Sequence, residues 1–148
     1  MQKGFTLIEV LIAIGIITIL ASVVLIAINP ARQFAQARDT ERISHLTAII
    51  NAIGQRIVDN KGTFEKDCSA GAIPSAQTVM KSTDGYNILP CLTPTYLSAM
   101  PFDPKTGSYV SDTEYNTGYT IMQNPTSGRI TVTAPNTELT TPDISITR

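Results

Sequence analysis

One long apolar run near the start of the sequence limits what this chain can fold into. From Phe5 to Ile28 it reads FTLIEVLIAIGIITILASVVLIAI, and Glu9 is its only charged residue. About 20 helical residues cross the roughly 30 Å hydrocarbon core of a bilayer, so the run is long enough to span one. A secretory signal peptide is the alternative, because Lys3 precedes the run and Ala35-Gln36-Ala37 could be a cleavage site. The apolar region of such a peptide, however, normally holds only about 7 to 15 residues.

The residues that open this run form a specific junction. Lys3-Gly4-Phe5-Thr6-Leu7-Ile8-Glu9-Val10 resembles the class III leader junction of type IV pilins and type II secretion pseudopilins, because Gly, Phe and Glu fall at the required spacing. The resemblance implies that a dedicated prepilin peptidase cuts after Gly4 and methylates the new N-terminus, Phe5. It also implies that the apolar helix is retained, first as a membrane anchor and then as the core of a filament.

Glu9 is the one charge inside the apolar segment. The simplest interpretation is a carboxylate near the headgroups, favoured by the positive end of the helix dipole. The resemblance adds a second one, in which Glu9 pairs with the α-ammonium of Phe5 from an axially staggered neighbour. In a low dielectric a misplaced subunit would leave the carboxylate unpaired, so the pair would set the register of a filament.

The helix is predicted to continue beyond Ile28, with two weak points. Pro30 lacks a backbone donor and clashes with the preceding turn, which predicts a kink or a locally melted turn. Gly15 also weakens the helix, and in the resembled pilins the apolar helix often bends at a glycine and a proline. The helix should end near Gly62, which suits a left-handed cap.

The second half of this helix has an apolar stripe that predicts packing on one face. Large aliphatic side chains recur there at spacings of three and four: Ile43, Leu46, Ile50, Ile53 and Ile57. We predict ordinary core packing for this stripe. The charged residues around its start are expected to form a solvated collar, or less often a subunit contact: Arg32, Arg38, Asp39, Glu41 and Arg42.

The residues from Gly62 onward differ in composition and form the predicted soluble head. They are rich in threonine and hold all five tyrosines. Alternating β-formers at 117–123 and 129–134, with turn residues between them, predict an antiparallel hairpin, and 143–148 predicts an edge strand. Thr93-Pro94 is typical of the start of a short helical turn. We therefore expect an α+β pilin fold, with the long helix packed on a small antiparallel sheet.

Four segments follow from these patterns. Residues 1–4 are the predicted leader, 5–28 the membrane-spanning and filament-core helix, 29–61 its amphipathic continuation, and 62–148 the head.

Cys68 and Cys91 are expected to form a disulfide, because the head lies outside the cytoplasm in this interpretation. Two buried free thiols are the alternative.

A second resemblance lies within the head. Residues 96–107, with Pro101-Phe102-Asp103-Pro104, are similar to a segment of major pseudopilins, although the tryptophan usual after the second proline is missing. Asp103 is expected to be a turn residue that accepts backbone hydrogen bonds. Major pseudopilins often hold calcium in the loop that follows, so Asp112, Glu114 and Asn116 are candidate calcium ligands. A solvated acidic loop is the alternative.

The residue inventory argues against an enzyme. His45 is the sole histidine, and neither paired carboxylates in a catalytic context nor a phosphate-binding glycine loop is present. In the head, five basic residues against eight acidic ones give a net charge of −3, so no specific nucleic-acid partner is predicted. No cofactor other than the candidate calcium ion is expected.

We therefore predict a structural subunit of a type IV pilus. The precursor would be a single-pass protein of the cytoplasmic membrane, whose partners are a prepilin peptidase with N-methyltransferase activity, an inner-membrane assembly platform and other copies of itself. The product would be an extracellular or periplasmic filament. A major pseudopilin of a type II secretion system is the first alternative, and an anchored or secreted domain unrelated to pilins is the more remote one.

Overall fold

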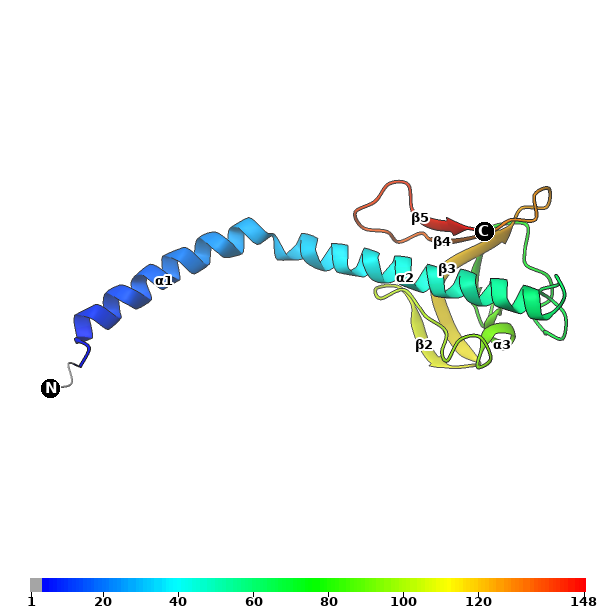
Figure 1. Ribbon diagram of the computed structural model, residues 1–148, viewed down its shortest axis with the longest axis horizontal. Coiled ribbons are helices and arrows are strands. Elements are labelled where there is room, and N and C mark those ends of the chain that lie inside the picture. Colours follow the sequence, from blue (N-terminus) through cyan, green and yellow to red (C-terminus); the bar gives the residue numbers. More distant parts are fainter. Residues whose placement is uncertain (1–3) are drawn as a thin grey trace. The chain divides into compact units, whose positions relative to one another are not determined.

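The computed structural model describes residues 4–148, apart from the side chains of Ile26 and Ala27. They form two compact units, with the boundary between Ala35 and Gln36. In chain order the elements are α1 (Leu7–Ile28), α2 (Pro30–Asp59), β1 (Thr78–Lys81), α3 (Leu89–Leu92), β2 (Ser108–Ser111), β3 (Glu114–Gln123), β4 (Ile130–Ala134) and β5 (Ile144–Thr147) (Figure 1). The predicted α+β, pilin-like architecture is therefore confirmed.

The first unit contains α1 and the beginning of α2, and α1 has no core of its own. None of the residues from Leu7 to Leu25 is buried. By length and composition this segment is apolar enough to cross a membrane. Because the exposed side chains are nearly all large and aliphatic, α1 needs lipid or other protein around it.

The long helix is interrupted once, immediately before Pro30. Asn29 adopts a left-handed conformation with φ 46°, and its backbone carbonyl accepts hydrogen bonds from Arg32 and Gln33 at the start of α2. The break falls here because a proline disfavours helical geometry in the residue before it, and asparagine tolerates the left-handed region. Gly15, the second predicted weak point, does not interrupt α1, since a glycine keeps its backbone hydrogen bonds.

In the second unit, one face of α2 packs into the hydrophobic core. Its buried aliphatic side chains follow helical spacing: Leu46, Ile49, Ile50, Ala52 and Ile53. They pack against residues of the sheet such as Tyr119, Ile121 and Val132. Ile43 was predicted to belong to this face, and that prediction is wrong, because its side chain is 49% exposed. The inward position one turn before Leu46 is taken by Arg42 instead.

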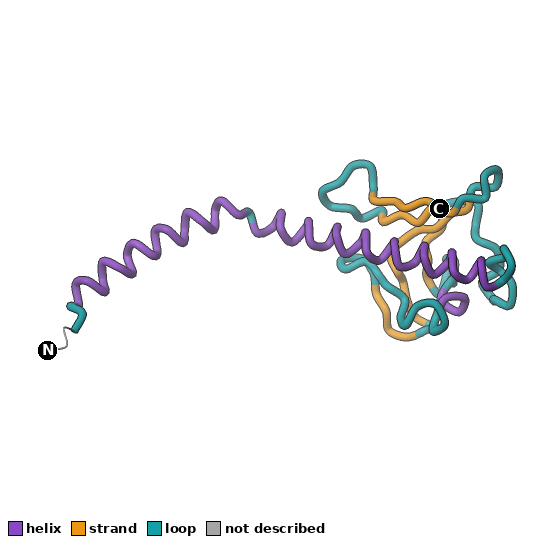
Figure 2. Tube along the Cα trace, viewed as in Figure 1, coloured by secondary structure: helices purple, strands orange, loops and turns teal. Residues whose placement is uncertain are grey.

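The sheet is antiparallel throughout and has the long strand β3 at its centre. The strand order is β1-β3-β4-β5, and β2 also pairs with β3. Figure 2 shows these strands gathered around the second half of α2. The predicted hairpin is confirmed as β3 and β4, with Thr120 opposite Thr133 and Gln123 opposite Ile130. The predicted edge strand is β5, which pairs with β4 and with no other strand of the described residues.

A disulfide joins the segments before and after β1, and its second cysteine lies in the short helix α3. The helical turn expected to start at Thr93-Pro94 is wrong in position, because α3 has its proline at Pro90 and ends with Thr93 as the C-cap. Cys68 and Cys91 form a disulfide, with their Cα atoms 5.4 Å apart. The chain on both sides of it is also held by Arg56, whose buried guanidinium donates to the carbonyls of Phe64, Lys66 and Cys91.

Candidate processing and assembly site

The predicted processing junction lies at the start of α1. Thr6 and Glu9 form a capping box, in which the Glu9 carboxylate accepts from Thr6 N at 2.8 Å and from Thr6 Oγ1 at 2.9 Å. In return Glu9 N donates to Thr6 Oγ1 at 3.3 Å. Threonine followed three residues later by glutamate is the sequence pattern of this cap, because the two side chains satisfy backbone donors that the first helical turn leaves free.

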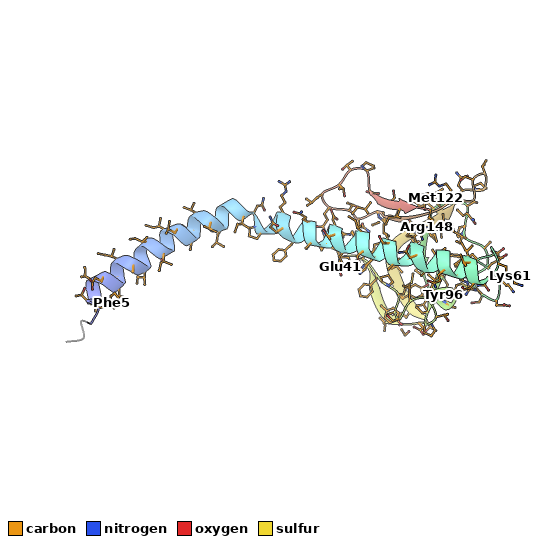
Figure 3. The ribbon with its side chains drawn as sticks, in the orientation of Figure 1. Phe5, Glu41, Lys61, Tyr96, Met122 and Arg148 are labelled. Atoms are coloured by element: carbon orange, nitrogen blue, oxygen red, sulfur yellow. A yellow bond between two sulfur atoms is a disulfide. The ribbon has the colours of Figure 1, made fainter. Side chains whose placement is uncertain are left out.

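The peptide bond between Gly4 and Phe5 is open to solvent in the isolated chain. Phe5 is 88% exposed and lies directly before α1 (Figure 3), and no other atom comes within 4 Å of a Cβ placed on Gly4. The capping box turns the Glu9 carboxylate back toward Phe5, because it binds the backbone of the very next residue, Thr6. Residues 1–3 of the predicted leader, including Lys3, lie outside the described residues.

The head unit contains a buried ion-pair network, which we call the Arg42 network: Arg38, Asp39, Arg42, Asp103 and Glu138. Its centre is the side chain of Arg42, 0% exposed, which faces the equally buried carboxylate of Asp103. Arg42 Nε donates to Asp103 Oδ2 at 2.6 Å, and its Nη1 donates to Asp39 at 2.7 Å. Glu138 joins the network through Arg42 at 3.2 Å and through two hydrogen bonds from Arg38, at 2.6 and 2.7 Å.

The turn that holds Asp103 is built by local hydrogen bonds and small residues. Asp103 Oδ1 accepts from the backbone N–H groups of Lys105 and Thr106, each at 2.9 Å, as the sequence predicted for this turn. Gly107 and Gly118 let the neighbouring chain approach, because a Cβ at Gly107 would lie 2.6 Å from Asp103 N and one at Gly118 2.9 Å from Asp103 Cβ. Gly118 also has φ +71°, which favours glycine.

The network joins three distant segments of the head. Asp39 lies on α2 and accepts from the backbone N–H groups of Glu138 and Leu139, at 3.1 and 2.9 Å. The loop between β4 and β5 is thereby fixed to α2, as the Asp103 turn is fixed by Arg42. The solvated collar predicted for these charges is therefore wrong for Arg42 and Asp39, while Glu41 is exposed. The helical pattern shows that α2 carries these charges. It does not show that Asp103 and Glu138, far along the chain, fold against them.

The network favours the charged forms of its acids. Hydrogen bonds from Arg38, followed by those from Arg42 and Lys105, lower the pKa of Glu138 from 4.5 to about 2, although partial burial opposes this. Burial raises the pKa of Asp103, but the hydrogen bonds from Arg42, Lys105 and Thr106 outweigh it, so the net shift is downward. The Asp103 carboxylate in turn raises the pKa of Arg42.

The lowered pKa of Glu138 predicts a loss of head stability in acid. A carboxyl group that is more acidic in the folded state stabilises the fold fully above pH 4.5, and this contribution is lost as the pH falls toward 2. We expect the free energy of unfolding, from denaturant titrations between pH 2 and 6, to fall across this window. Glu138→Gln should flatten the slope, whereas Glu114→Gln, at an exposed site, should leave it unchanged. Equal slopes in the wild type and Glu138→Gln would contradict the prediction.

The three candidate calcium ligands lie in the turn between β2 and β3 and at the start of β3. Asp112 is in the turn between β2 and β3 and accepts a hydrogen bond from the Tyr109 hydroxyl. Glu114 opens β3, and Asn116 accepts from Gly118 N at 2.9 Å. Within residues 4–148, no group of three or more His, Cys, Asp or Glu side chains is arranged to hold a metal ion.

Comparison with known proteins identifies the N-terminal segment. Residues 1–25 match the family model of the prokaryotic N-terminal methylation motif. Neither the curated proteins nor the solved structures contain a match. The chain therefore carries the class III prepilin-like signal of the type IV pilin and pseudopilin family. Together with the apolar helix behind this signal and an α+β head, the motif supports a type IV pilin or pseudopilin precursor.

The motif indicates the general class of this protein, how it is processed and where it is anchored. The motif belongs to structural subunits rather than enzymes, and it implies processing by a prepilin peptidase and polymerisation into filaments. Together with α1 it indicates anchoring in a membrane before assembly. The roles of Gly4, Phe5 and Glu9 in processing and assembly stay predictions. Sequence reasoning missed Thr6, although the pattern of Thr and Glu three residues apart was there to signal the cap.

Proposed function

We propose that this protein is the structural subunit of a type IV pilus. The observation that carries the proposal is α1, a capped apolar helix with no buried residue between Leu7 and Leu25, directly behind the methylation motif. In the proposed pathway residues 1–4 are removed, and Phe5 is methylated. Residues 5–28 then serve as anchor and filament core, 29–61 continue the helix, and 62–148 form the displayed head. No catalysis is required of it.

The physical problem in assembly is the transfer of α1 from lipid to a bundle of identical helices. Lipid tails are as apolar as leucine, so this transfer brings little hydrophobic gain and must be directed by packing and polar groups. Glu9 is the only charged residue in the apolar segment. Cleavage after Gly4 creates an α-ammonium on Phe5. An ion pair between this group and Glu9 of a neighbouring subunit would stabilise one axial stagger of the subunits more than all others.

The Thr6–Glu9 cap fits this role. It holds the carboxylate at the end of α1 that carries the new ammonium, with two donors already in place at 2.8 and 2.9 Å. A carboxylate has lone pairs for about four hydrogen bonds, so it can accept the ammonium of a neighbour without losing its cap. Thr6 would therefore hold the Glu9 carboxylate in position for this pairing before assembly begins.

A major pseudopilin is the second candidate. It is favoured by the Pro101–Pro104 segment, whose Asp103 is the buried partner of Arg42. In a pseudopilin the same N-terminal chemistry would build a short periplasmic fibre that acts in protein secretion. The two candidates therefore differ in where the fibre ends and not in how the subunit is processed.

Intact mass and N-terminal sequencing of the membrane-extracted protein, followed by electron microscopy of the cells, test the proposal. We expect a mature chain that begins at methylated Phe5 and fibres that extend from the cell surface. A methylated Phe5 with fibres confined to the periplasm would favour the pseudopilin. A chain that starts at Met1, or at Arg38 after ordinary signal cleavage, would overturn both candidates.

A further inference from the structure

The head unit has a small apolar groove that its own chain leaves open. The groove lies between α2 and β4, has a volume of about 250 Å³, and is lined by Ile50, Ile53, Gly54, Ile57, Gly128, Ile130 and Arg148. Pockets for small molecules usually measure about 300 to 1,000 Å³. This one is below that range, and its size suits a protruding side chain of another protein.

The same unit has a protruding apolar feature on strand β2. Val110 is 70% exposed and Tyr109 is 39% exposed. One edge of β2 pairs with β3, and the other pairs with no strand in the part of the chain that the structure describes. A free strand edge with apolar side chains is a favourable contact surface for a second chain.

Groove and strand lie on different faces of the head. Figure 3 shows Arg148, which lines the groove, on one side of α2, and Figure 1 shows β2 on the other side. The β2 edge of one chain therefore cannot occupy the groove of the same chain. A contact between different faces of identical molecules is heterologous, and repeated contacts of this kind form open helical polymers rather than closed dimers.

The charges beside the two surfaces are complementary. Arg148 lines the groove and Arg129 is an exposed neighbour of Gly128 and Ile130, which also line it. The exposed acids Asp112 and Glu114 follow directly after β2. None of these four side chains forms an ion pair within residues 4–148. Two arginines therefore lie beside the groove, although Asp59 is also near Arg148, and two acids lie beside the strand, where Asp112 accepts a hydrogen bond from Tyr109. Opposite charges on the two surfaces favour their approach.

We propose that the β2 edge, centred on Val110, docks into the α2–β4 groove of a second copy of this chain. The contact rests on the proposed filament function and adds a head-to-head interface to the packing of α1. Val110 enters the apolar groove, and Asp112 and Glu114 approach Arg148 and Arg129 of the neighbouring copy.

Cysteine cross-linking of the full-length protein in cells tests this contact. Cells that express Val110→Cys and Ile57→Cys subunits together, treated with a bifunctional maleimide, should yield cross-linked dimers of this chain. The matched control replaces Ile57→Cys by Ile43→Cys, an aliphatic position on the same helix that is 49% exposed but does not line the groove. The control should give a several-fold lower yield. Asp112→Lys added to the Val110→Cys subunit should lower the yield, and Arg148→Glu on the Ile57→Cys subunit should restore it.

Fibre imaging of the same cells separates this proposal from the pilus function. Fibres without the Val110–Ile57 cross-link, or with equal yield from the Ile43 control, would overturn the docking contact alone. The cross-link without fibres would support the contact and contradict the pilus function. Absence of the cross-link and of fibres would overturn the docking contact and the pilus function. Cross-linking of Ile57→Cys to a different protein would show that the groove does not bind a second copy of this chain. Normal removal of the leader and an unchanged melting temperature show that each variant is folded.

Discussion

Glu9→Ala is expected to leave the protein processed, methylated and membrane-inserted, yet unable to form fibres. Removal of one partner of a buried ion pair costs about 3–5 kcal/mol, which corresponds to a loss in subunit association of roughly 10²-fold to several thousand-fold. The cost arises because each Phe5 ammonium would enter the filament core without a carboxylate. The measurement is fibre yield sheared from cells, normalised to the amount of mature subunit in the membrane fraction.

Two further variants separate the charge of Glu9 from its role as a helix cap. Glu9→Gln can still accept the Thr6 hydrogen bonds of the capping box but carries no charge, so it should fail in assembly as Glu9→Ala does. Thr6→Ala removes the cap and keeps the charge, and it should still assemble, at a cost of about 1 kcal/mol in helix stability. Wild-type fibre yield from Glu9→Gln would mean that charge pairing does not direct assembly.

Arg42→Leu is expected to be the most damaging single change in the head, with a loss of about 3–5 kcal/mol in the free energy of unfolding. It would leave the fully buried Asp103 without its cation and would also remove the hydrogen bonds that Asp39 and Glu138 accept. Denaturant titration of the full-length protein in detergent, followed by near-ultraviolet circular dichroism, measures the loss.

Arg38→Leu is the matched control for this experiment. Arg38 is a third exposed and, within residues 4–148, forms an ion pair with Glu138 alone, so its removal should cost no more than about 1 kcal/mol. Replacement of both central partners, as in Arg42→Leu with Asp103→Leu, should be less damaging than Arg42→Leu alone, because the fully buried Asp103 carboxylate is removed together with its cation. Equal losses for Arg42→Leu and Arg38→Leu would show that burial of the central pair does not matter.

The parts of the head that could be predicted from sequence are those specified by neighbouring residues. The β3–β4 hairpin follows from alternating β-formers on both sides of a turn, and most of the α2 stripe follows from helical spacing. Strands β1 and β2 have only four residues each and carry no clear alternation, so they were not predicted. The turn at Thr93-Pro94 was misplaced because α3 starts after Ile88, which makes no side-chain cap, so its start has no capping signal in the sequence.

The N-terminal junction and the Arg42 network also differ in how far they could be predicted from the sequence. Gly4, Phe5 and Glu9 could be singled out from the sequence because they lie in one contiguous motif, within the matched residues 1–25. The Arg42 network is invisible there, since the partner of Arg42 lies 61 positions away and only the folded chain brings the two together. Charge next to an apolar stripe usually means solvent exposure, and only the Asp103 turn and the loop near Glu138 reverse that expectation.

The central position of β3 has a consequence for how the head responds to damage. β1, β2 and β4 all pair with β3, and β5 depends on it through β4. The strand also supplies Tyr119 and Ile121, both fully buried. No strand but β5 can detach without breaking contacts with β3, so the rest of the sheet is one cooperative unit. A head built this way either holds its shape or loses it as a whole, which suits a subunit that has to present the same surface in every copy.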